Sequence, residues 1–437
     1  MNYQTKIIKY KLLLVLTFFF LLRIIYAYFS SYQEIPAQGD VVTYNEYALA
    51  ILNKADWLAN PDFLGHYRPP VYPMFLAIIY SIFGAENLFA VYFFQAIIST
   101  LTVYYIFKLS SSIFDEKKSF LSLFWAGFYC FYLWYAKLII RETLIIFLII
   151  FSFYHLWIFL KNKEKTHYLK SIDLWKFMIA FTILLHTDAR YLFYIPFISI
   201  LFVIYKNIWV GVKQYSCVLG IFILLLIPWS IRNYIAYDGF VLINTRTIDA
   251  RQENISVRLE ILSGGEATQL INKNYPSEEE RTLIKKGKNP NNRSRDEINI
   301  IKKDVYAPTT FIGKRLYRFK EMWIPFRFWS DYEPFPEAKF KGPWSLKHNL
   351  GSIVFYGILI PFVFYNVFYL FKKREKEIYF LIFPIVIHTL LHFLMWGKER
   401  YRLPIDAFII ILGCYGIIIF TENLKKIKKR FFSRYSP

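Results

Sequence analysis

Residues 142–160 read ETLIIFLIIFSFYHLWIFL, an apolar run whose one acidic side chain stands at its first position. A run of about twenty such residues can cross the hydrocarbon core of a bilayer as a helix. Similar blocks recur along the chain near 10–29, 87–107, 119–136, 173–187, 190–205, 214–231, 349–371, 378–397 and 404–421. The sequence therefore predicts an all-α polytopic membrane protein with about ten transmembrane helices.

The composition excludes a soluble globular protein, because 56% of the residues are hydrophobic and 21% are aromatic. The net charge of +21 would suggest nucleic acid on a soluble chain. Here the basic residues lie between apolar blocks, which favours a role in topology and in contact with membrane lipids, and not nucleic-acid binding. Cys130, Cys217 and Cys414 each lie inside a block, which fits neither a disulfide framework nor a zinc site.

Lysine-rich segments alternate with segments that are poor in lysine, and this alternation predicts the topology. Cytoplasmic loops accumulate Lys and Arg. With the N-terminus inside and the first block retained as a helix, the basic segments all fall inside, at 6–11, 108–118, 161–170, 206–213, 372–376 and in the tail 422–437. We expect a multi-pass protein of the cytoplasmic (inner) membrane with both termini in the cytoplasm. The count of ten depends on a break between His186 and Arg190.

Two long outer segments divide the chain. The first, 30–87, contains two amphipathic pieces, at 43–58 and 69–84, which we expect to be helices along the membrane surface. The second, 232–348, is polar in its middle and aromatic and basic at its end, and we expect it to be partly helical. The predicted organisation is an N-terminal transmembrane module (1–231), the long outer loop (232–348), and C-terminal helices with a basic tail (349–437).

Under this topology, most of the unusual ionisable residues fall at the outer face. They are Asp40, Glu46, His66, Arg68, Glu142, Asp188, Arg190, Arg232, Arg400 and Arg402. Ionisable groups at membrane depth are costly and mark functional sites or pair with one another. Acids and arginines together suit a phosphate-linked substrate, because a carboxylate can take a proton from a hydroxyl and arginines can hold a phosphate.

Each of these residues also has a purely structural interpretation. Asp40 can cap a helix, Arg68 can extend its charged end to the lipid headgroups, and Glu142 can favour a helix start. Asp188 and Arg190 can pair as a loop salt bridge, and the two late arginines can anchor the membrane edge. His388 and His392 share one helical face at metal-binding spacing, although histidines that bond across helices fit that pattern better.

Several stretches together resemble one family. They are GDVVTYNEYALAIL (39–52), YRPPVYPMFLAIIYSIFG (67–84), RETLIIFLIIF (141–151), LIPWSIRNYIAYDGFVLI (226–243) and ERYRLPIDAFIIIL (399–412). In this order they resemble the integral-membrane glycosyltransferases of the GT-C superfamily. The closest branch is the family 39-like one, bacterial relatives of protein O-mannosyltransferases and lipid A aminoarabinose transferases.

The resemblance implies roles for individual residues. Asp40 matches the acid that serves as catalytic base, and Arg68 stands where the family has a basic residue on the donor phosphate. Glu142 matches an acid near the active site. Arg232, Arg400 and Arg402 match further candidates for phosphate contact. Many superfamily members carry two adjacent acids in this loop, whereas Val41 and Val42 follow here, so the sequence leaves a divalent metal open and implies no certain cofactor.

The expected function is transfer of a sugar from a polyprenyl-phosphate donor to an acceptor hydroxyl at the outer face, with inversion and Asp40 as general base. The sequence leaves the acceptor open among protein, lipid A, another glycolipid and a cell-wall polymer. Two other functions stay open. One is an O-antigen polymerase or ligase, although those proteins usually lack such an early acidic loop. The other is a lipid or polysaccharide transporter, although the charges here collect at one face and not at the midplane.

Overall fold

The computed structural model describes residues 3–30, 40–53, 68–162, 168–237, 240–244, 311–325, 346–395 and 399–435, and every element within them is helical. Seven helical stretches among these residues are long and apolar enough to cross a membrane. They are built from α1 (Tyr3–Ser30), α4 (Leu88–Ile113), α7 (Glu142–Lys161), α10 (Ile208–Tyr237), α16 to α17 (Leu346–Ser352, the π-turn Ile353–Gly357, Leu359–Lys373), α18 (Glu377–Leu394) and α19 (Leu403–Tyr435). The chain is therefore an all-α multi-pass membrane protein, as the sequence predicts.

The other three apolar blocks form shorter helices. These are α5 (Glu116–Phe128), α6 (Cys130–Ala136), α8 (Ile172–Thr187), and the 3₁₀ turn Ala189–Phe193 that leads into α9 (Tyr194–Tyr205). The break expected between His186 and Arg190 is present, because Asp188 has extended backbone and its side chain accepts the amide of Arg190. The count of ten crossings therefore remains a prediction, since these helices are shorter than a full span.

One expectation needs correction, because 119–136 is not a continuous helix. The helix stops at Phe128 and restarts at Cys130, and Tyr129 between them has non-helical backbone angles of φ −58° and ψ 108°. The Tyr129 hydroxyl lies 2.6 Å from a carboxylate oxygen of Asp406 in α19. A buried hydroxyl needs a hydrogen-bond partner, and the hydropathy of the sequence cannot show that Asp406 supplies it.

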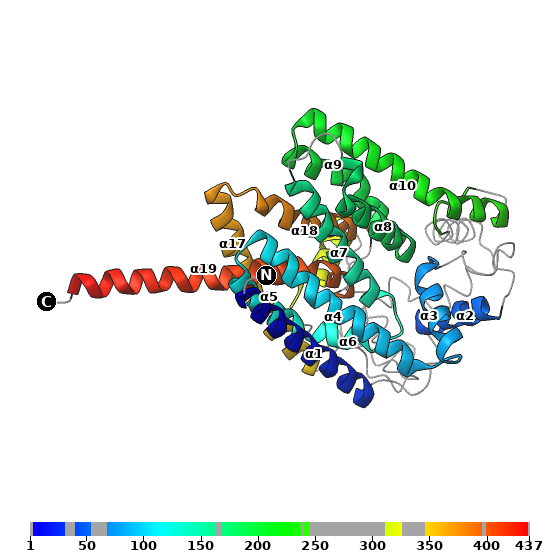
Figure 1. Cartoon of the computed structure of the whole chain (residues 1–437), viewed down its shortest axis with the longest axis horizontal. Coiled ribbons are helices and arrows are strands. Elements are labelled where there is room, and N and C mark those ends of the chain that lie inside the picture. The colour runs from blue at the N-terminus through cyan, green and yellow to red at the C-terminus, as the bar shows by residue number, and fades with distance from the viewer. Residues whose placement is uncertain are drawn as a thin grey trace, which may run out of the picture.

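The first outer segment contains the two expected surface helices, α2 (Asp40–Leu52) and α3 (Val71–Phe83). They pack against each other, and α3 also contacts the start of α4. In Figure 1, α2 and α3 lie at one end of the bundle, and the distal part of α19 projects at the opposite end. From the second outer segment the structure describes α15 (Phe311–Trp323), which packs on α18.

The core of the bundle is built around α7 and α19. In the most apolar 18-residue stretch of α7, 72% of the residues are buried, and in that of α19, 78% are buried. For α1, at the edge of the bundle, the share is 17%. The helix α19 packs closely on α17, and a Cβ at Gly416 would lie 2.1 Å from the backbone oxygen of Phe362. Glycine allows this close approach of two backbones, as small residues do in membrane bundles.

The two ends of the bundle differ in charge. At one end, Lys161 donates to the carbonyl of Ser112, and Lys118 pairs with Glu422, so lysine-bearing helix ends meet there. At the other end lie the start of α7, the end of α8 and the start of α19, which bring acids and arginines together. The helix α7 connects the two ends, with Glu142 first and Lys161 last.

This difference in charge generates a prediction of sidedness. We expect a cysteine at Ala85, an exposed position before α4, to react with an impermeant maleimide on intact cells. A cysteine at Glu116, exposed beyond the other end of α4, should react only after permeabilisation, because the neighbouring lysines keep that end inside. Both variants are made in a background without the three native cysteines, and the opposite labelling pattern would contradict the topology.

Candidate active site at one end of the bundle

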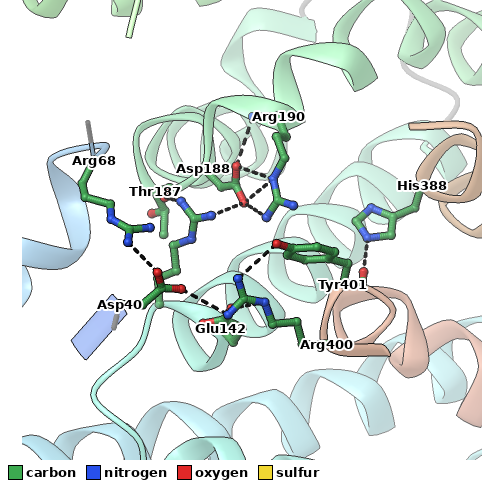
Figure 2. Close-up of polar contacts among 10 residues, drawn as sticks. Asp40, Arg68, Glu142, Thr187, Asp188, Arg190, His388, Arg400 and Tyr401 are labelled. Atoms are coloured by element: carbon green, nitrogen blue, oxygen red, sulfur yellow. Dashed lines mark hydrogen bonds and ion pairs between the residues drawn. The ribbon is translucent and has the colours of Figure 1, made fainter. Parts of the chain in front are cut away.

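Asp40 is the first residue of α2, and its carboxylate lies between two arginines from distant parts of the chain (Figure 2). Its Oδ1 lies 2.5 Å from Nη2 of Arg68, and its Oδ2 lies 3.1 Å from Nη1 of Arg400. These partners are 28 and 360 residues away in sequence. The side chain of Asp40 is 29% exposed, so the carboxylate is accessible to a small acceptor group while it remains partly dry.

The pKa of Asp40 reports this environment. Burial alone would raise the pKa, but the guanidinium groups of Arg68 and Arg400 outweigh burial and lower the pKa to about 2. Arg68 itself is buried, precedes the two prolines that lead into α3, and packs 5.0 Å from the ring centroid of Tyr44. Asp40 is therefore an ionised carboxylate at neutral pH.

Arg400 comes from the short 3₁₀ turn Glu399–Tyr401 between α18 and α19. Besides Asp40, its Nε lies 3.9 Å from Oε1 of Glu142, the buried first residue of α7. Burial would lower the pKa of Arg400, but the facing Glu142 together with Tyr401 and Asp40 raises it above its ordinary value. Arg400 thus faces two carboxylates, from α2 and α7.

Asp188 forms a second carboxylate–arginine group beside the first. Its Oδ2 lies 3.2 Å from Nη2 of Arg141, and its two oxygens accept from Nε of Arg190 at 2.9 and 3.0 Å. Burial would raise the pKa of Asp188, but Arg141 and Arg190 outweigh it and hold the pKa well below the usual range. The loop pairing of Asp188 with Arg190, one of the structural interpretations of the sequence, is present, and Arg141, which the sequence analysis did not select as a site residue, joins it.

Tyr401 links the two groups, and sequence reasoning missed it. Its hydroxyl accepts from Nη2 of Arg400 at 3.0 Å, and the guanidinium of Arg190 lies 4.4 Å from its ring centroid. Burial would raise the pKa of Tyr401, but Arg400 and Arg190 lower it below the ordinary value. The available signal was its place between two arginines in ERYR, since a tyrosine among cations acts as acceptor and as a cation–π surface.

Among the described residues, Asp40, Arg68, Glu142, Asp188, Arg190 and Arg400 are thus brought together, with Arg141 and Tyr401 in addition. We call these eight residues the charge cluster. Four arginines face three carboxylates in it, which leaves one net positive charge. Because the carboxylates leave one arginine charge unneutralised, this cluster is suited to bind an anion.

Other candidates lie elsewhere. Glu46 is exposed on α2. Arg232 is buried in α10, where it donates to Asn233 and lies over the ring of Trp229. His66 lies outside the described residues.

Arg402 is placed differently from the expectation of phosphate contact. It is fully buried, its Nε lies 2.9 Å from Oδ1 of Asp406, and its guanidinium carbon lies 3.4 Å from the ring centroid of Tyr356. It also donates to the carbonyl of Met322 in α15. Because its nearest acid is the equally buried Asp406, we do not carry Arg402 into the proposed phosphate site.

The two histidines serve packing in the structure. His388 bonds the carbonyl of Tyr401, and His392 stacks on the Tyr401 ring at 4.9 Å between centroids. Across the described part of the chain, no three His, Cys, Asp or Glu side chains are grouped so that they could hold a metal ion.

Comparison with known proteins bears on the fold. Residues 67–231 match the family profile described as dolichyl-phosphate-mannose-protein mannosyltransferase. The oligosaccharyltransferase of Archaeoglobus fulgidus in its apo form has 15% identity and a TM-score of 0.57, over 97% of this chain and 52% of its own. ArnT of Cupriavidus metallidurans in the apo state has 10% identity and a TM-score of 0.54, over 92% and 59%.

The chain therefore shares the GT-C fold of these two structures. The resemblance seen in the sequence motifs is therefore confirmed at the level of fold. A. fulgidus AglB has also been solved with an inhibitory peptide and a dolichol-phosphate, and it matches with 13% identity and a TM-score of 0.56, over 98% of this chain and 52% of its own. The chain spans about half the length of these structures, and no curated protein sequence matches it.

The placement of Arg402 generates a stability prediction for this GT-C fold. Replacing Arg402 by Met should leave the Asp406 carboxylate buried without its cation and destabilise the protein by about 3–5 kcal/mol. Thermal unfolding of the purified full chain in detergent measures this. The double variant Arg402→Met with Asp406→Leu should recover most of the loss. If Arg402→Met unfolds at the same temperature as the unmodified chain but no longer binds a phosphate ligand, Arg402 is instead a residue of the phosphate-binding site.

Proposed function

We propose that the chain is a glycosyltransferase that moves a sugar from a polyprenyl-phosphate donor to an acceptor hydroxyl, with inversion at the anomeric carbon. The observation that carries this proposal is the carboxylate of Asp40, partly exposed and held between Arg68 and Arg400. A base and two fixed cations then lie within one small site. This is the set of groups that displacement of a phosphate by a hydroxyl requires.

The cations address the leaving group. When the bond between the anomeric carbon and the phosphate oxygen breaks, the phosphate keeps the electron pair and its negative charge grows. Guanidinium groups aimed at that charge lower the barrier more in a partly dry site than in water. Arg68 and Arg400 are the cations we assign to this role, since both contact Asp40, the proposed base, whereas Arg141 and Arg190 contact Asp188.

The carboxylate addresses the acceptor. As the acceptor oxygen bonds to the anomeric carbon, its proton passes to Asp40. The sugar passes from the phosphate oxygen to the acceptor oxygen in a single displacement, with no covalent intermediate on the enzyme. A single displacement predicts inversion at the anomeric carbon. Glu142, next to Arg400, helps to hold that arginine in place.

The membrane location follows from the donor. A polyprenyl tail dissolves in the bilayer, so the donor reaches the site sideways from the membrane. The dolichol-phosphate bound in AglB, a protein of the same fold, supports a lipid-linked donor here. The lysine-bearing end of the bundle supports an inner location for both termini, and with that topology the charge cluster would lie at the outer face of the cytoplasmic membrane.

The direct test is removal of the base. We expect Asp40→Asn to lower the rate of sugar transfer by about 100- to 10,000-fold, because the amide cannot accept the acceptor's proton. Transfer is measured in membranes supplied with polyprenyl-phosphate sugars and membrane extracts as acceptors. Glu116→Gln, an acid-to-amide change at the opposite end of the bundle, should leave the rate unchanged at equal expression. Full activity of Asp40→Asn would refute the assignment.

A further inference from the structure

Both oxygens of the Asp40 carboxylate are occupied in the structure, and this has a consequence for the order of events. Oδ1 is bonded to Arg68 and Oδ2 to Arg400, the two guanidinium groups that the proposed function assigns to the donor phosphate. A guanidinium group binds carboxylates and phosphates in the same way, through parallel N–H···O bonds. Asp40 therefore occupies, on both arginines, the positions that a donor phosphate would take.

The burial of Arg68 explains its pairing with Asp40. The side chain of Arg68 is only 4% exposed, so its charge is poorly solvated and needs an anion. Asp40 supplies that anion from the start of α2. The same pairing makes Asp40 a poor base, since it lowers the pKa of the carboxyl to about 2, far below the neutral pH at which proton transfer would be efficient.

The geometry of inversion excludes the same arrangement during the reaction. In an in-line displacement the acceptor oxygen and the leaving phosphate lie on opposite sides of the anomeric carbon. The base lies beside the acceptor and the arginines lie beside the phosphate. Arginines that kept both bonds to Asp40 would hold the base against the leaving group, with no room for the sugar between them.

We propose that the donor phosphate displaces the Asp40 carboxylate from Arg68 and Arg400, so that binding of the donor itself releases the general base. The step is an exchange of ion-pair partners, with no bond made or broken in the substrate. It rests on the proposed function and adds to it an order of events, in which the donor binds before the acceptor can be deprotonated.

The other contacts of Arg400 allow the exchange. Its Nη2 donates to the hydroxyl of Tyr401, and its Nε faces Glu142 at 3.9 Å. These partners lie on the 3₁₀ turn and on α7, away from α2, so Arg400 keeps its position when Asp40 leaves. Asp188 with Arg141 and Arg190 is a separate group that the exchange leaves intact.

If Asp40 competes with the ligand for the two arginines, removing the Asp40 carboxylate should increase the affinity for the ligand, whereas removing a ligand-binding residue usually decreases it. Asp40→Asn should bind farnesyl phosphate, a short polyprenyl phosphate without sugar, about tenfold more tightly than the unmodified chain, because the ligand no longer displaces a carboxylate. Binding is measured by calorimetry on the full chain in detergent, with farnesol and inorganic phosphate to separate the contributions of tail and phosphate. A residue that only contacts or orients the donor would show weaker or equal binding when replaced.

A matched variant controls for the overall charge. Asp188→Asn removes one carboxylate from the same cluster but frees Arg141 and Arg190, which the proposal does not assign to phosphate. Its affinity for farnesyl phosphate should stay within about twofold of the unmodified chain. Equal tightening in both variants would mean that net charge alone governs binding, and it would overturn the exchange.

A second measurement uses the unmodified protein, in case Asp40→Asn does not fold. Carbodiimides react with protonated carboxyl groups, so at about pH 5 their rate of reaction reports how far a carboxyl pKa is depressed. Farnesyl phosphate should increase the labelling of Asp40 about tenfold, read by mass spectrometry of its peptide, and should leave Asp188 unchanged. Unchanged labelling of Asp40 at saturating ligand would overturn the exchange.

The two proposals fail separately. If Asp40→Asn abolishes transfer but binds farnesyl phosphate no more tightly, the exchange is wrong and the glycosyltransferase assignment stands. If Asp40→Asn retains full transfer, the proposed function of Asp40 fails, whatever the affinity.

Discussion

A guanidinium group that is withdrawn from water is stabilised by an anion beside it, because an unpaired buried charge costs several kcal/mol. This interaction organises the end of the bundle that carries Asp40. Arg68 is nearly buried and is neutralised by Asp40, which sits at the start of α2. Asp188 neutralises Arg141 and Arg190, and these pairs bring together the ends of α7 and α8 and the loop before α3. Charge pairing therefore acts together with apolar packing in holding α2 and α3 against the bundle.

Arg400 and Arg402 illustrate how the same constraint separates two neighbouring residues. Both belong to the segment that opens α19, and both were candidates for the same role. The 3₁₀ turn directs Arg400 toward Asp40 and Glu142, where its side chain remains 29% exposed. Arg402 instead meets Asp406 one helical turn further on and is wholly enclosed with it. One arginine is thus available to a ligand, and the other fixes α19 against α15 and the turn beneath the site.

The sequence predicts a good part of this fold, because apolar block length and lysine distribution are recorded directly in the residues. It also places Asp40, Arg68, Glu142, Asp188, Arg190 and Arg400 at one face, where the structure brings them together. It does not reveal partners. Tyr129, at the helix break, donates to Asp406, which is 277 residues away, and the buried Arg402 pairs with that same acid. Tyr401 went unnoticed because a tyrosine in a membrane protein is ordinary until its neighbours are known.

The balance of charge in the charge cluster connects the structure to the proposed reaction. With four arginines and three carboxylates, the cluster is one negative charge short of neutrality. A bound phosphate supplies that charge, but it can reach Arg68 and Arg400 only by taking over bonds that Asp40 now makes. The displaced carboxylate then has fewer cations around it, and its affinity for a proton rises. The same anion that completes the electrostatics of the site therefore makes the base competent, so that base activation and donor binding are one event.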